Sequence, residues 1–392
     1  MTRGRPTLRL KRGHATPRSH PWIFKGDVAE VDSVEPGTEV AVIDSAGRFV
    51  GRGLYNPRPG LCCRILTWTD ELLNAAFFRR QLELALALRA RGHAQPPSLC
   101  RLVWSEADGL PGLVVDRYGF VLVMQCLTLG MSRLRRTIVE ALTGLLGDLQ
   151  VFDMDEEASA RLEGFSPVRG WARDPGPRSV RVNEGGVGFD VTIGVGHKTG
   201  LYLDQRENRL RVGALARDRD ILDAFSYTGG FACHALHGGA RRAICIESSP
   251  DAIAGARQNL ALNGVAARAE ILTTNAFDEL RRLERTGTRF GVIVLDPPPF
   301  ARNRSAVDAA ARGYKEINLR ALRMLEPGGS LLTFSCSHHV SDALFEDICR
   351  GAATDAGVRI RVADRLTQAS DHPVLLNVPE TRYLKGLLLE AL

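Results

Sequence analysis

The chain has 392 residues, of which 44% are hydrophobic and 24% charged, with a formal net charge of +6. This length exceeds one ordinary domain, so two or three domains are expected. No apolar run reaches the roughly 18 residues of a membrane-spanning helix, and the first residues lack the apolar core of a secretory signal. We therefore expect a soluble, cytoplasmic protein, and the positive charge favours a polyanionic partner.

The eight cysteines agree with this compartment. They lie at positions 62, 63, 100, 126, 233, 245, 336 and 349, without a C-x-x-C pair or a regular spacing. This pattern is typical of thiols in a reducing cytoplasm rather than of disulfides or a structural zinc site. His338 and His339 are adjacent and point in different directions, so we predict no metal site.

The N-terminal segment is strongly basic. Seven basic residues precede the first acidic residue, Asp27: Arg3, Arg5, Arg9, Lys11, Arg12, Arg18 and Lys25. Such a cluster indicates contact with nucleic acid, although a solvated basic face or an organelle transit peptide would look similar. The apolar run 22–24 argues against a transit peptide, because it resembles the core of a domain that has already begun.

Two domains are predicted before residue 195. Residues 34–55 form short strands broken by Pro-Gly and Ser-Ala-Gly turns, and with the basic segment they make a β-rich domain over 1–70. A helix is predicted over 70–92, followed by the strand-like runs LCRLVWS and GLVVDRYGFVLVMQCL, the second a hairpin around Arg117–Gly119. A helix near 131–146 and the strand pair VRVNEGGVGFDVTI complete a small central α+β domain over 71–194.

The pattern of apolar segments changes near residue 195. Apolar strand cores occur in DILDAFS, RAICIES, ARAEILT, GVIVLDP and SLLTFSC, and helix-length segments separate them. Strands that are apolar throughout and alternate with helices predict a parallel sheet that is covered on both faces. We therefore interpret 195–392 as a doubly wound, Rossmann-like α/β domain, whose ligands bind beyond the carboxyl ends of the strands.

The first turns of this sheet predict a nucleoside site. Gly229 and Gly230 follow the first strand and let the backbone approach a ligand. Glu247 ends the second strand, where its carboxylate can accept hydrogen bonds from a ribose diol. The turn is not G-x-G-x-x-G, which argues against a dinucleotide and for a ligand without phosphates, such as S-adenosylmethionine. Asn275, after the third strand, is placed to bind adenine; each residue could instead be a loop cap.

The next two strands predict the reaction site. The fourth runs into DPPPF, where prolines hold Asp296 on a stiff segment with free carbonyl groups. Pro297, Pro298 and Phe300 can then form a rigid lip for a flipped-out base, with the phenyl ring stacked on it. The fifth strand runs into FSCSHH, which brings Cys336 to the same edge.

Cys336 decides which chemistry is predicted. Carbon 5 of cytosine is a poor nucleophile, and addition of a thiolate to carbon 6 makes an enamine that can attack a methyl donor. Loss of the proton from carbon 5 then expels the thiol. The alternative interpretation is an inert buried thiol at the end of a strand.

At this point the sequence resembles a known family, the RlmI-type PUA-domain-containing class I methyltransferases, which form 5-methylcytosine in 23S rRNA. The likeness covers nearly the whole chain, through GHATPRSHPWIFKGDV, EADGLPGLVVDRYG, GHKTGLYLDQRENR and DHPVLLNVPETRYLKG. It implies a PUA-like β-barrel at the N-terminus, S-adenosylmethionine as cofactor, RNA as partner and a possible homodimer. The stretch TGL-x-LD-x-R also occurs in rRNA guanine methyltransferases, so it does not distinguish carbon from nitrogen methylation.

The resemblance also implies roles for single residues. Those that would line or brace the cofactor pocket are Lys198, Thr199, Tyr202, Asp204, Arg206, Phe225, Ser226, Gly229, Glu247 and Asn275. Asp296 would hold the target base and Cys336 would be the nucleophile. Asp204 could instead brace the fold by pairing with Arg206 or Arg209.

Two positions depart from the family pattern. Pro299 stands where the family usually has lysine, which removes a charge beside the base and resembles amino-group methyltransferases. Asn275 stands where it usually has aspartate, and keeps an acceptor for adenine. Two alternatives therefore stay open: a guanine or adenine amino-group methyltransferase, in which Cys336 would be inert, and a non-catalytic RNA-binding protein with a vestigial cofactor fold.

Overall fold

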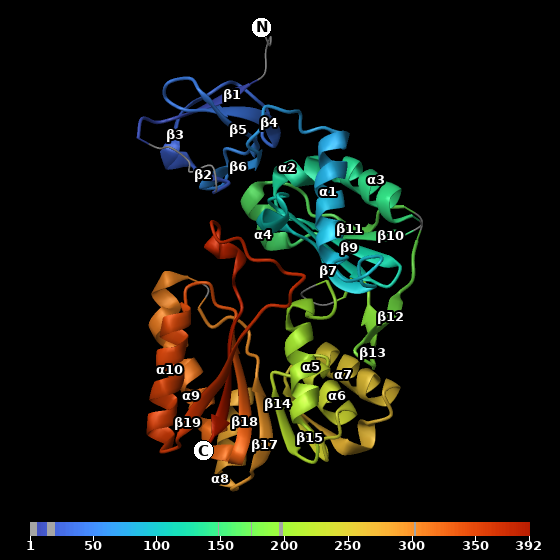
Figure 1. The fold of residues 1–392 in the computed structure, drawn as a ribbon, viewed down its shortest axis with the longest axis vertical. Helices are drawn as coiled ribbons and strands as arrows, with labels where there is room; N and C mark the ends of the chain where they lie inside the picture. The colour runs from blue at the N-terminus through green and yellow to red at the C-terminus, as the bar shows by residue number, and fades with distance from the viewer. Residues whose placement is uncertain (1–5, 14–19, 148, 174, 196–198, 302) are drawn as a thin grey trace. The chain divides into compact units, whose positions relative to one another are not determined.

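The computed structural model describes residues 6–13, 20–147, 149–173, 175–195, 199–301 and 303–392. The chain folds as two compact units (Figure 1). The first unit comprises Met1–Val180, Val191–Gly200 and Ser370–Thr381, and the second comprises Arg181–Asp190, Leu201–Ala369 and Arg382–Leu392. The first unit thus contains most of the sequence predicted to form two domains before residue 195, together with a short segment from near the C-terminus, whereas Arg181–Asp190, from the strand pair expected to complete the central domain, belongs to the second unit.

The first unit begins with a six-stranded sheet in the order β2-β6-β5-β4-β1-β3. Its strands are β1 (Thr7–Leu10), β2 (Trp22–Phe24), β3 (Val28–Val31), β4 (Thr38–Ile43), β5 (Phe49–Tyr55) and β6 (Leu61–Thr67). All neighbouring pairs are antiparallel except β1 and β4. Leu8, Ile23, Val40 and Cys63 are fully buried in its core, so the apolar run near Trp22 does belong to a folded sheet.

A five-stranded sheet follows in the order β11-β10-β9-β8-β7. Its strands are β7 (Leu99–Trp104), β8 (Leu113–Tyr118), β9 (Val121–Cys126), β10 (Gln150–Met154) and β11 (Arg169–Trp171). The predicted hairpin is confirmed: β8 and β9 pair around Gly119, which has φ +62°. The helices of this part are α1 (Ala75–Arg89), α2 (Leu129–Arg133), α3 (Arg135–Leu146) and α4 (Glu157–Glu163).

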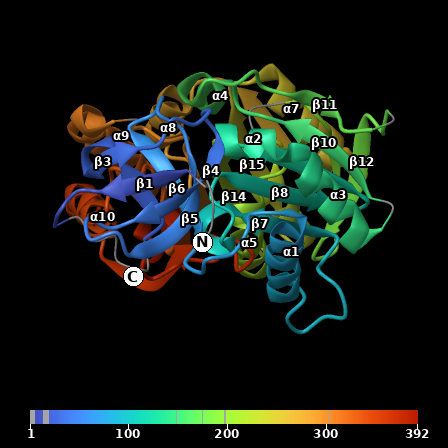
Figure 2. The same cartoon turned by 90° about the horizontal axis from the view of Figure 1, so that it is seen from above.

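Helices α1 and α3 lie side by side over the five-stranded sheet (Figures 1 and 2). Helix α1 begins at Asn74, whose side-chain oxygen accepts a hydrogen bond from the Phe77 N–H at 3.1 Å. An asparagine before the first helical turn satisfies one of the free amides there. Strands β12 (Ser179–Glu184) and β13 (Val187–Thr192) form a separate two-stranded sheet, as predicted from VRVNEGGVGFDVTI.

The second unit is built on a seven-stranded sheet in the order β16-β15-β14-β17-β18-β20-β19. Its strands are β14 (Asp220–Ala224), β15 (Arg242–Glu247), β16 (Ala269–Thr273), β17 (Phe290–Leu295), β18 (Leu325–Ser335), β19 (Ile360–Thr367) and β20 (Lys385–Ala391). The first five are parallel, as predicted, and β20 runs antiparallel between β18 and β19.

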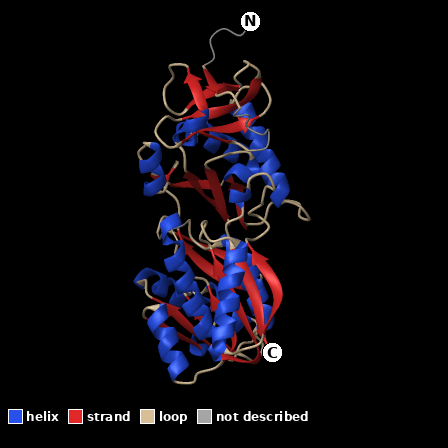
Figure 3. Ribbon diagram, turned by 90° about the vertical axis from the view of Figure 1, so that its left-hand side faces the viewer, coloured by secondary structure: helices blue, strands red, loops and turns tan. Residues whose placement is uncertain are grey.

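Helices cover both faces of this sheet (Figure 1), and Figure 3 draws the helices in blue and the strands in red. One layer contains α5 (Arg206–Leu215), α6 (Gly230–His237) and α7 (Pro250–Leu262). The other contains α8 (Ala276–Arg285), α9 (Val307–Met324) and α10 (Asp342–Ala356). Short 3-10 helices are Lys25–Asp27, Ser105–Asp108, Leu203–Gln205, Ala266–Arg268, Arg304–Ala306 and Pro379–Thr381. None of the helices in the described ranges is long and apolar enough to cross a membrane.

The chain order reverses between β14 and β17, which are neighbours in the sheet. In a doubly wound sheet such a reversal leaves a crevice beyond the carboxyl ends of the two strands. The segments that leave this edge are those after Ala224, Glu247, Leu295 and Ser335. They contain most of the site residues predicted from the sequence.

Candidate active site

The turn after β14 has an unusual backbone. Phe225 and Tyr227 have φ of +64° and +49°, which side chains other than glycine rarely adopt, and Gly229 has φ +74°. The turn is held in place because the buried Ser226 donates its N–H to the Ile246 carbonyl at 3.0 Å. Non-glycine residues in this conformation persist only where the surroundings impose it, and they concentrate at functional sites.

Glu247 links this turn to the end of β15. Its Oε2 accepts the Tyr227 N–H at 2.9 Å, and its Oε1 accepts the N–H groups of Ser248 and Ser249 at 2.7 and 2.8 Å. A carboxylate has about four acceptor sites, so three amide bonds leave about one. If Glu247 binds a ribose diol, one hydroxyl can donate to the remaining acceptor site. The second hydroxyl must then donate to a carboxylate oxygen that already accepts a backbone N–H.

Asn275 caps the helix that follows β16. Its Oδ1 accepts the N–H groups of Phe277 and Asp278 at 2.9 and 3.4 Å. The side-chain oxygen that was predicted to bind adenine is therefore already used by helix α8. The group that Asn275 can still present to a ligand is its amide N–H, which is a donor.

Asp223, at the end of β14, was not assigned a role from the sequence. Its side chain is completely buried, and Oδ2 accepts the Ala232 N–H at 3.0 Å. Oδ1 has no hydrogen-bond partner among the described residues. Burial raises the pKa of Asp223 to about 8, and the carboxylates of Asp296 and Glu247 act in the same direction. An acidic residue four positions before the tyrosine-glycine turn was the signal available in the sequence.

The stretch 199–209 is divided between the two units. Lys198 lies outside the described residues. Thr199 belongs to the first unit, where its hydroxyl donates to Asp116 Oδ2 at 2.6 Å and lies 3.1 Å from the Tyr118 hydroxyl. These contacts account for the burial of Thr199 within that unit, and its predicted cofactor role stays a prediction.

The remainder of the stretch lies in the second unit. The Tyr202 ring packs edge-on against Tyr227, with centroids 4.9 Å apart. Asp204 accepts a hydrogen bond from the Tyr383 hydroxyl at 2.6 Å. Arg206 is the first residue of α5. Tyr202 is thereby fixed next to the strained turn after β14.

Arg209 anchors the backbone of Tyr202. Its guanidinium forms a fork with Glu184, with N–O distances of 2.6 and 2.7 Å, and donates to the Tyr202 carbonyl at 2.7 Å. His234 lies 2.9 Å from the same carboxylate. The sequence indicated Arg209 as one possible partner of Asp204, but Arg209 pairs with Glu184 instead.

The loop after β17 begins with Asp296, whose N–H lies 3.5 Å from the Ala224 carbonyl. Pro297 is buried, whereas Pro298 is exposed. Phe300 packs into an aromatic cluster, with ring centroids 4.6 Å from Tyr314 and 5.6 Å from Phe277. The Phe300 ring therefore already has ring partners at the edge of the core, and its stacking on a base stays a prediction.

Cys336 immediately follows β18 and is partly exposed, whereas the other seven cysteines are buried. Burial raises the pKa of Cys233 and Cys349 to about 12, so these thiols are poor nucleophiles. The Cys336 thiol lies 3.8 Å from the Pro297 carbonyl, which places the ends of β17 and β18 in contact. Cys336 is the accessible thiol of the described chain.

Buried hydroxyl groups fix the loop around Cys336. The Tyr314 hydroxyl, on α9, accepts from Ser335 Oγ at 3.0 Å and lies 3.0 Å from Ser337 Oγ. Ser337 Oγ in turn accepts the Ala301 N–H at 3.2 Å. The residues on either side of Cys336 are thus tied to the loop that follows Asp296.

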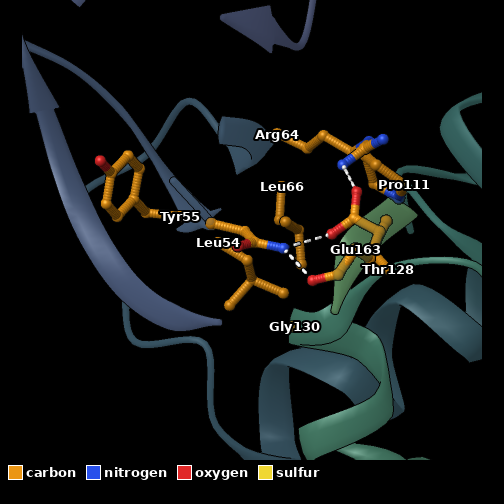
Figure 4. A pocket seen from close by; sticks show the side chains of 9 residues that line it. Leu54, Tyr55, Arg64, Leu66, Pro111, Thr128, Gly130 and Glu163 are labelled. Atoms are coloured by element: carbon orange, nitrogen blue, oxygen red, sulfur yellow. Dashed lines mark hydrogen bonds and ion pairs between the residues drawn. The ribbon is translucent and has the colours of Figure 1, made fainter. Parts of the chain in front are cut away.

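A pocket in the first unit has a different character (Figure 4). Its lining includes Glu163, at the end of α4, whose carboxylate accepts from Asn56 at 2.8 Å and from Arg64 at 2.9 Å. The polar groups of this pocket therefore bind one another and join the six-stranded sheet to α4. Across the described ranges, no three His, Cys, Asp or Glu side chains gather in a way that could hold a metal ion.

The edge near β14 fits a cationic nucleoside. It offers a glycine turn without a phosphate cradle, a fixed carboxylate at Glu247, and the buried oxygen of Asp223 that lacks a partner among the described residues. Residues 170–389 match the family model of the S-adenosylmethionine-dependent methyltransferases, and residues 7–68 match a PUA-like domain. Fold, site and family model together define an S-adenosylmethionine-dependent methyltransferase.

The chain belongs to the ribosomal RNA large subunit methyltransferase I family. It is 40% identical over 389 residues to the member from Alteromonas mediterranea, with 98% of each chain covered. It is 39% identical over 388 residues to the member from Klebsiella pneumoniae strain 342, with 97% of each covered. The resemblance noted in the sequence is thereby confirmed, as are the predicted cofactor and the PUA-like domain.

Solved structures share the fold over the full length. A SAM-dependent methyltransferase from Streptococcus mutans superposes with a TM-score of 0.83 at 18% identity, covering 98% of this chain and 99% of that one. A second methyltransferase structure, complexed with SAH, gives a TM-score of 0.82 at 19% identity, covering 95% and 96%. These likenesses extend the shared architecture to both units.

Proposed function

We propose that this chain methylates carbon 5 of a cytosine in large-subunit rRNA, with S-adenosylmethionine as methyl donor and Cys336 as covalent nucleophile. The observation that carries the proposal is the position of Cys336. It is a partly exposed thiol whose sulfur lies 3.8 Å from the Pro297 carbonyl, next to Asp296. The family name of the relatives supports large-subunit rRNA as the substrate class.

The proposed chemistry uses two neighbouring loops. Bound S-adenosylmethionine supplies an electrophilic methyl group. The Cys336 thiolate adds to carbon 6 of cytosine, and the electron pair released toward carbon 5 takes up the methyl group. A base then removes the proton from carbon 5, the sulfur–carbon 6 bond breaks, and the thiolate is regenerated. Asp296 would accept a hydrogen bond from the cytosine amino group and hold the ring over the sulfur.

The cofactor would lie along the ends of β14, β15 and β16. Glu247 would hold a ribose hydroxyl and Asn275 would donate to the adenine ring. Asp223 would meet a positively charged part of the cofactor, because its Oδ1 is buried without a partner among the described residues. Phe225, Ser226 and Gly229 would shape the turn on the methionine side, with Tyr202, Asp204 and Arg206 behind it.

The six-stranded sheet would provide a surface for RNA. Lys11 and Lys25 donate to the carbonyl groups of Gly26 and Arg58 at 2.7 and 3.1 Å, so the ammonium groups meet neutral acceptors there. Such ammonium groups can bind phosphates and release counterions, which supplies affinity without sequence readout. Arg3, Arg5 and Arg18 of the basic segment lie outside the described residues.

A second candidate function is methylation of an amino group on guanine or adenine. Pro299 favours it, because the expected lysine is missing and the loop is closer to the D-P-P-aromatic pattern of amino-group methyltransferases. In that reaction Asp296 and the proline carbonyls would hold the amine, and Cys336 would take no part.

The identity of the methylated nucleoside separates the two candidates. The enzyme is incubated with methyl-labelled S-adenosylmethionine and either naked large-subunit rRNA or assembling ribosomal particles, and the RNA is digested to nucleosides. We expect the label in 5-methylcytidine. Label in a methylguanosine or methyladenosine would establish the second candidate, and no transfer to either RNA, with the cofactor bound, would exclude both.

A further inference from the structure

Lys385 is a buried lysine next to the proposed nucleophile. It is the first residue of β20 and lies opposite Ser335 in the antiparallel pairing with β18. Its relative exposure is 5%. Cys336 is the residue directly after Ser335, so the strand pairing brings the two side chains to the same end of the sheet. Neither spacing nor periodicity indicated this relationship, because the two positions are 49 residues apart in the sequence.

The Lys385 ammonium has no carboxylate partner among the described residues. Its Nζ donates to the Ser337 carbonyl at 3.0 Å, within the loop that carries Cys336. The carboxylate that acts to raise the pKa of Lys385, Asp342, is already paired with Arg382 at 2.7 Å. A buried ammonium that contacts only neutral groups is unfavourable, and an anion beside it would stabilise its charge.

The charges around Lys385 agree with this view. Burial lowers the pKa of Lys385, while Asp342 and an ionised Cys336 act to raise it, and Arg382 acts to lower it. Lys385 and the Cys336 thiol are therefore close enough for their charges to interact. Formation of the Cys336 thiolate would give the buried ammonium its counter-charge.

We propose that the Lys385 ammonium stabilises Cys336 as a thiolate in the resting enzyme, so that the nucleophile is ready before RNA binds. This inference rests on the proposed function of Cys336. The thiol loses its proton to solvent, and the resulting sulfur anion is paired with the ammonium. Lys385 is then a positioning residue, because it acts on the substrate only through Cys336. The same pairing would stabilise the thiolate when the sulfur–carbon 6 bond breaks.

Other groups near Cys336 also affect the charge of its sulfur. The Pro297 carbonyl at 3.8 Å and the Asp296 carboxylate on the same loop disfavour a negative sulfur. Tyr202 and Tyr314 also interact with Cys336, but burial raises the pKa of both hydroxyls, which keeps them neutral at neutral pH. His338 and His339 are exposed and follow in the sequence. A contact between an ion and a carbonyl dipole at 3.8 Å is weaker than an attraction between two charges shielded from water.

The test measures the Cys336 thiol directly, without RNA. The full-length enzyme is alkylated with iodoacetamide, a neutral reagent, across a pH series, and modification of the Cys336 peptide is quantified by mass spectrometry. We expect wild-type Cys336 to titrate below the ordinary thiol pKa of about 8.5. Lys385→Met should raise that pKa by about one unit or more, which slows alkylation at neutral pH by roughly tenfold. Lys385→Arg should keep most of the wild-type rate.

A matched control removes another lysine of the second unit. Lys315, on α9, pairs with Asp355 at 2.7 Å and is 43% exposed, so Lys315→Met should leave the titration of Cys336 unchanged. A wild-type thiol that titrates at or above the ordinary value would overturn the inference, even if Lys385→Met fails to fold. An unchanged titration in folded Lys385→Met would also overturn it.

Failure of this inference is distinguishable from failure of the proposed function. If Cys336→Ser abolishes methyl transfer while Lys385→Met leaves the thiol pKa unchanged, Cys336 is the nucleophile and Lys385 does not stabilise its thiolate. If Cys336→Ser retains full methyl transfer, the proposed function is wrong, whatever the alkylation shows. A low thiol pKa in the wild type that depends on the charge of residue 385 supports the inference in either case.

Discussion

The carbonyl oxygen of Pro297 lies 3.8 Å from the sulfur of Cys336. Two loops that leave neighbouring strands, β17 and β18, thus meet at one point beyond the sheet. One loop begins with the carboxylate of Asp296 and the other contains the accessible thiol. The three prolines that follow β17 hold their backbone stiff at this junction, because each has a fixed φ and no N–H to donate. Pro297 is buried at the junction, where its carbonyl faces the thiol.

The buried carboxyl group of Asp223 should make stability depend on pH. Its pKa is raised from an ordinary value of 3.8 to about 8, chiefly by burial. The unfolded chain ionises this group above about pH 4, whereas the folded chain ionises it only near pH 8. Its contribution to stability is therefore fully present below pH 4 and is lost as the pH rises toward 8.

Asp223→Asn removes this dependence. Without cofactor, the free energy of unfolding of the variant should rise relative to that of the wild type between about pH 5 and pH 8. The gain should be on the order of 2–4 kcal/mol, since each pKa unit corresponds to about 1.4 kcal/mol. Urea unfolding of both proteins across this range measures the difference. Parallel stability curves would show that Asp223 titrates normally in the folded chain.

The side chain at position 275 should control cofactor affinity. Asn275→Asp keeps an oxygen for the cap of α8, since aspartate is an equally good capping residue, but it removes the amide N–H that would donate to the adenine ring. Affinity for S-adenosylhomocysteine, measured by calorimetry, should fall several-fold, because a hydrogen bond contributes about 1 kcal/mol net.

Asn74→Asp is the matched control for this change. Asn74 caps α1 in the first unit through the same kind of hydrogen bond, at 3.1 Å to the Phe77 N–H. The control should leave cofactor affinity unchanged. Equal affinities of Asn275→Asp and wild type would place adenine away from residue 275.

The pairing of Glu184 with Arg209 should be essential for the second unit. Burial acts to raise the pKa of Glu184, but Arg209 and His234 outweigh it and lower that pKa to about 2. The ionised pair therefore stabilises the fold above the ordinary glutamate pKa, and this contribution is lost as the pH falls toward 2. Glu184→Gln should cost about 3–5 kcal/mol at neutral pH, because it leaves a buried guanidinium without its counter-charge.

Thermal and urea unfolding test this prediction, with Glu83→Gln as control. Glu83 forms an exposed pair with Arg79 at 3.0 Å on α1, and such pairs contribute less than about 1 kcal/mol. A destabilisation by Glu184→Gln as small as that by Glu83→Gln would mean that Arg209 finds another anion.

The basic side chains of the six-stranded sheet should contribute to RNA affinity through charge alone. Replacing Lys11 and Lys25 together with Gln should weaken rRNA binding and reduce the slope of log K against log salt by about one for each phosphate that is no longer neutralised. Filter binding at several salt concentrations measures this slope. Arg136→Gln, which removes an exposed arginine paired with Glu140 at 2.8 Å, should leave the slope as it is. An unchanged slope in the double variant would place RNA elsewhere.

Much of the second unit could be predicted from the sequence, since its parallel strands are apolar throughout and each ends in residues with recognisable chemistry. Strands β14 to β18 were predicted on this basis, and they bring Glu247, Asp296 and Cys336 to one edge of the sheet. Strands β19 and β20 were missed. The faces of β19 are largely exposed, so its sequence lacks the continuous apolar pattern.

Other features depend on contacts between distant residues, which periodicity does not reveal. The segment 370–381 joins the first unit although it follows most of the second in sequence. The side-chain oxygen of Asn275 accepts a hydrogen bond from the helix that it caps, so it is not available to adenine as the sequence suggested. Lys385 reaches the Cys336 loop only because β20 inserts antiparallel beside β18. Asp223 draws its altered pKa from complete burial, which a single sequence does not specify.

The proposed reaction depends most on Cys336 acting as a covalent nucleophile toward cytosine. An rRNA pool that carries 5-fluorocytidine tests this directly, because fluorine on carbon 5 cannot leave as a proton does and the enzyme–RNA adduct is trapped. Incubation with S-adenosylmethionine should give an adduct that survives a denaturing gel with the wild type and with Cys349→Ala, a variant of a buried cysteine on α10. Cys336→Ser should give none, and its methyl transfer to ordinary RNA should fall by roughly 10³-fold or more. No adduct in the wild type, together with undiminished methyl transfer by Cys336→Ser, would contradict the account.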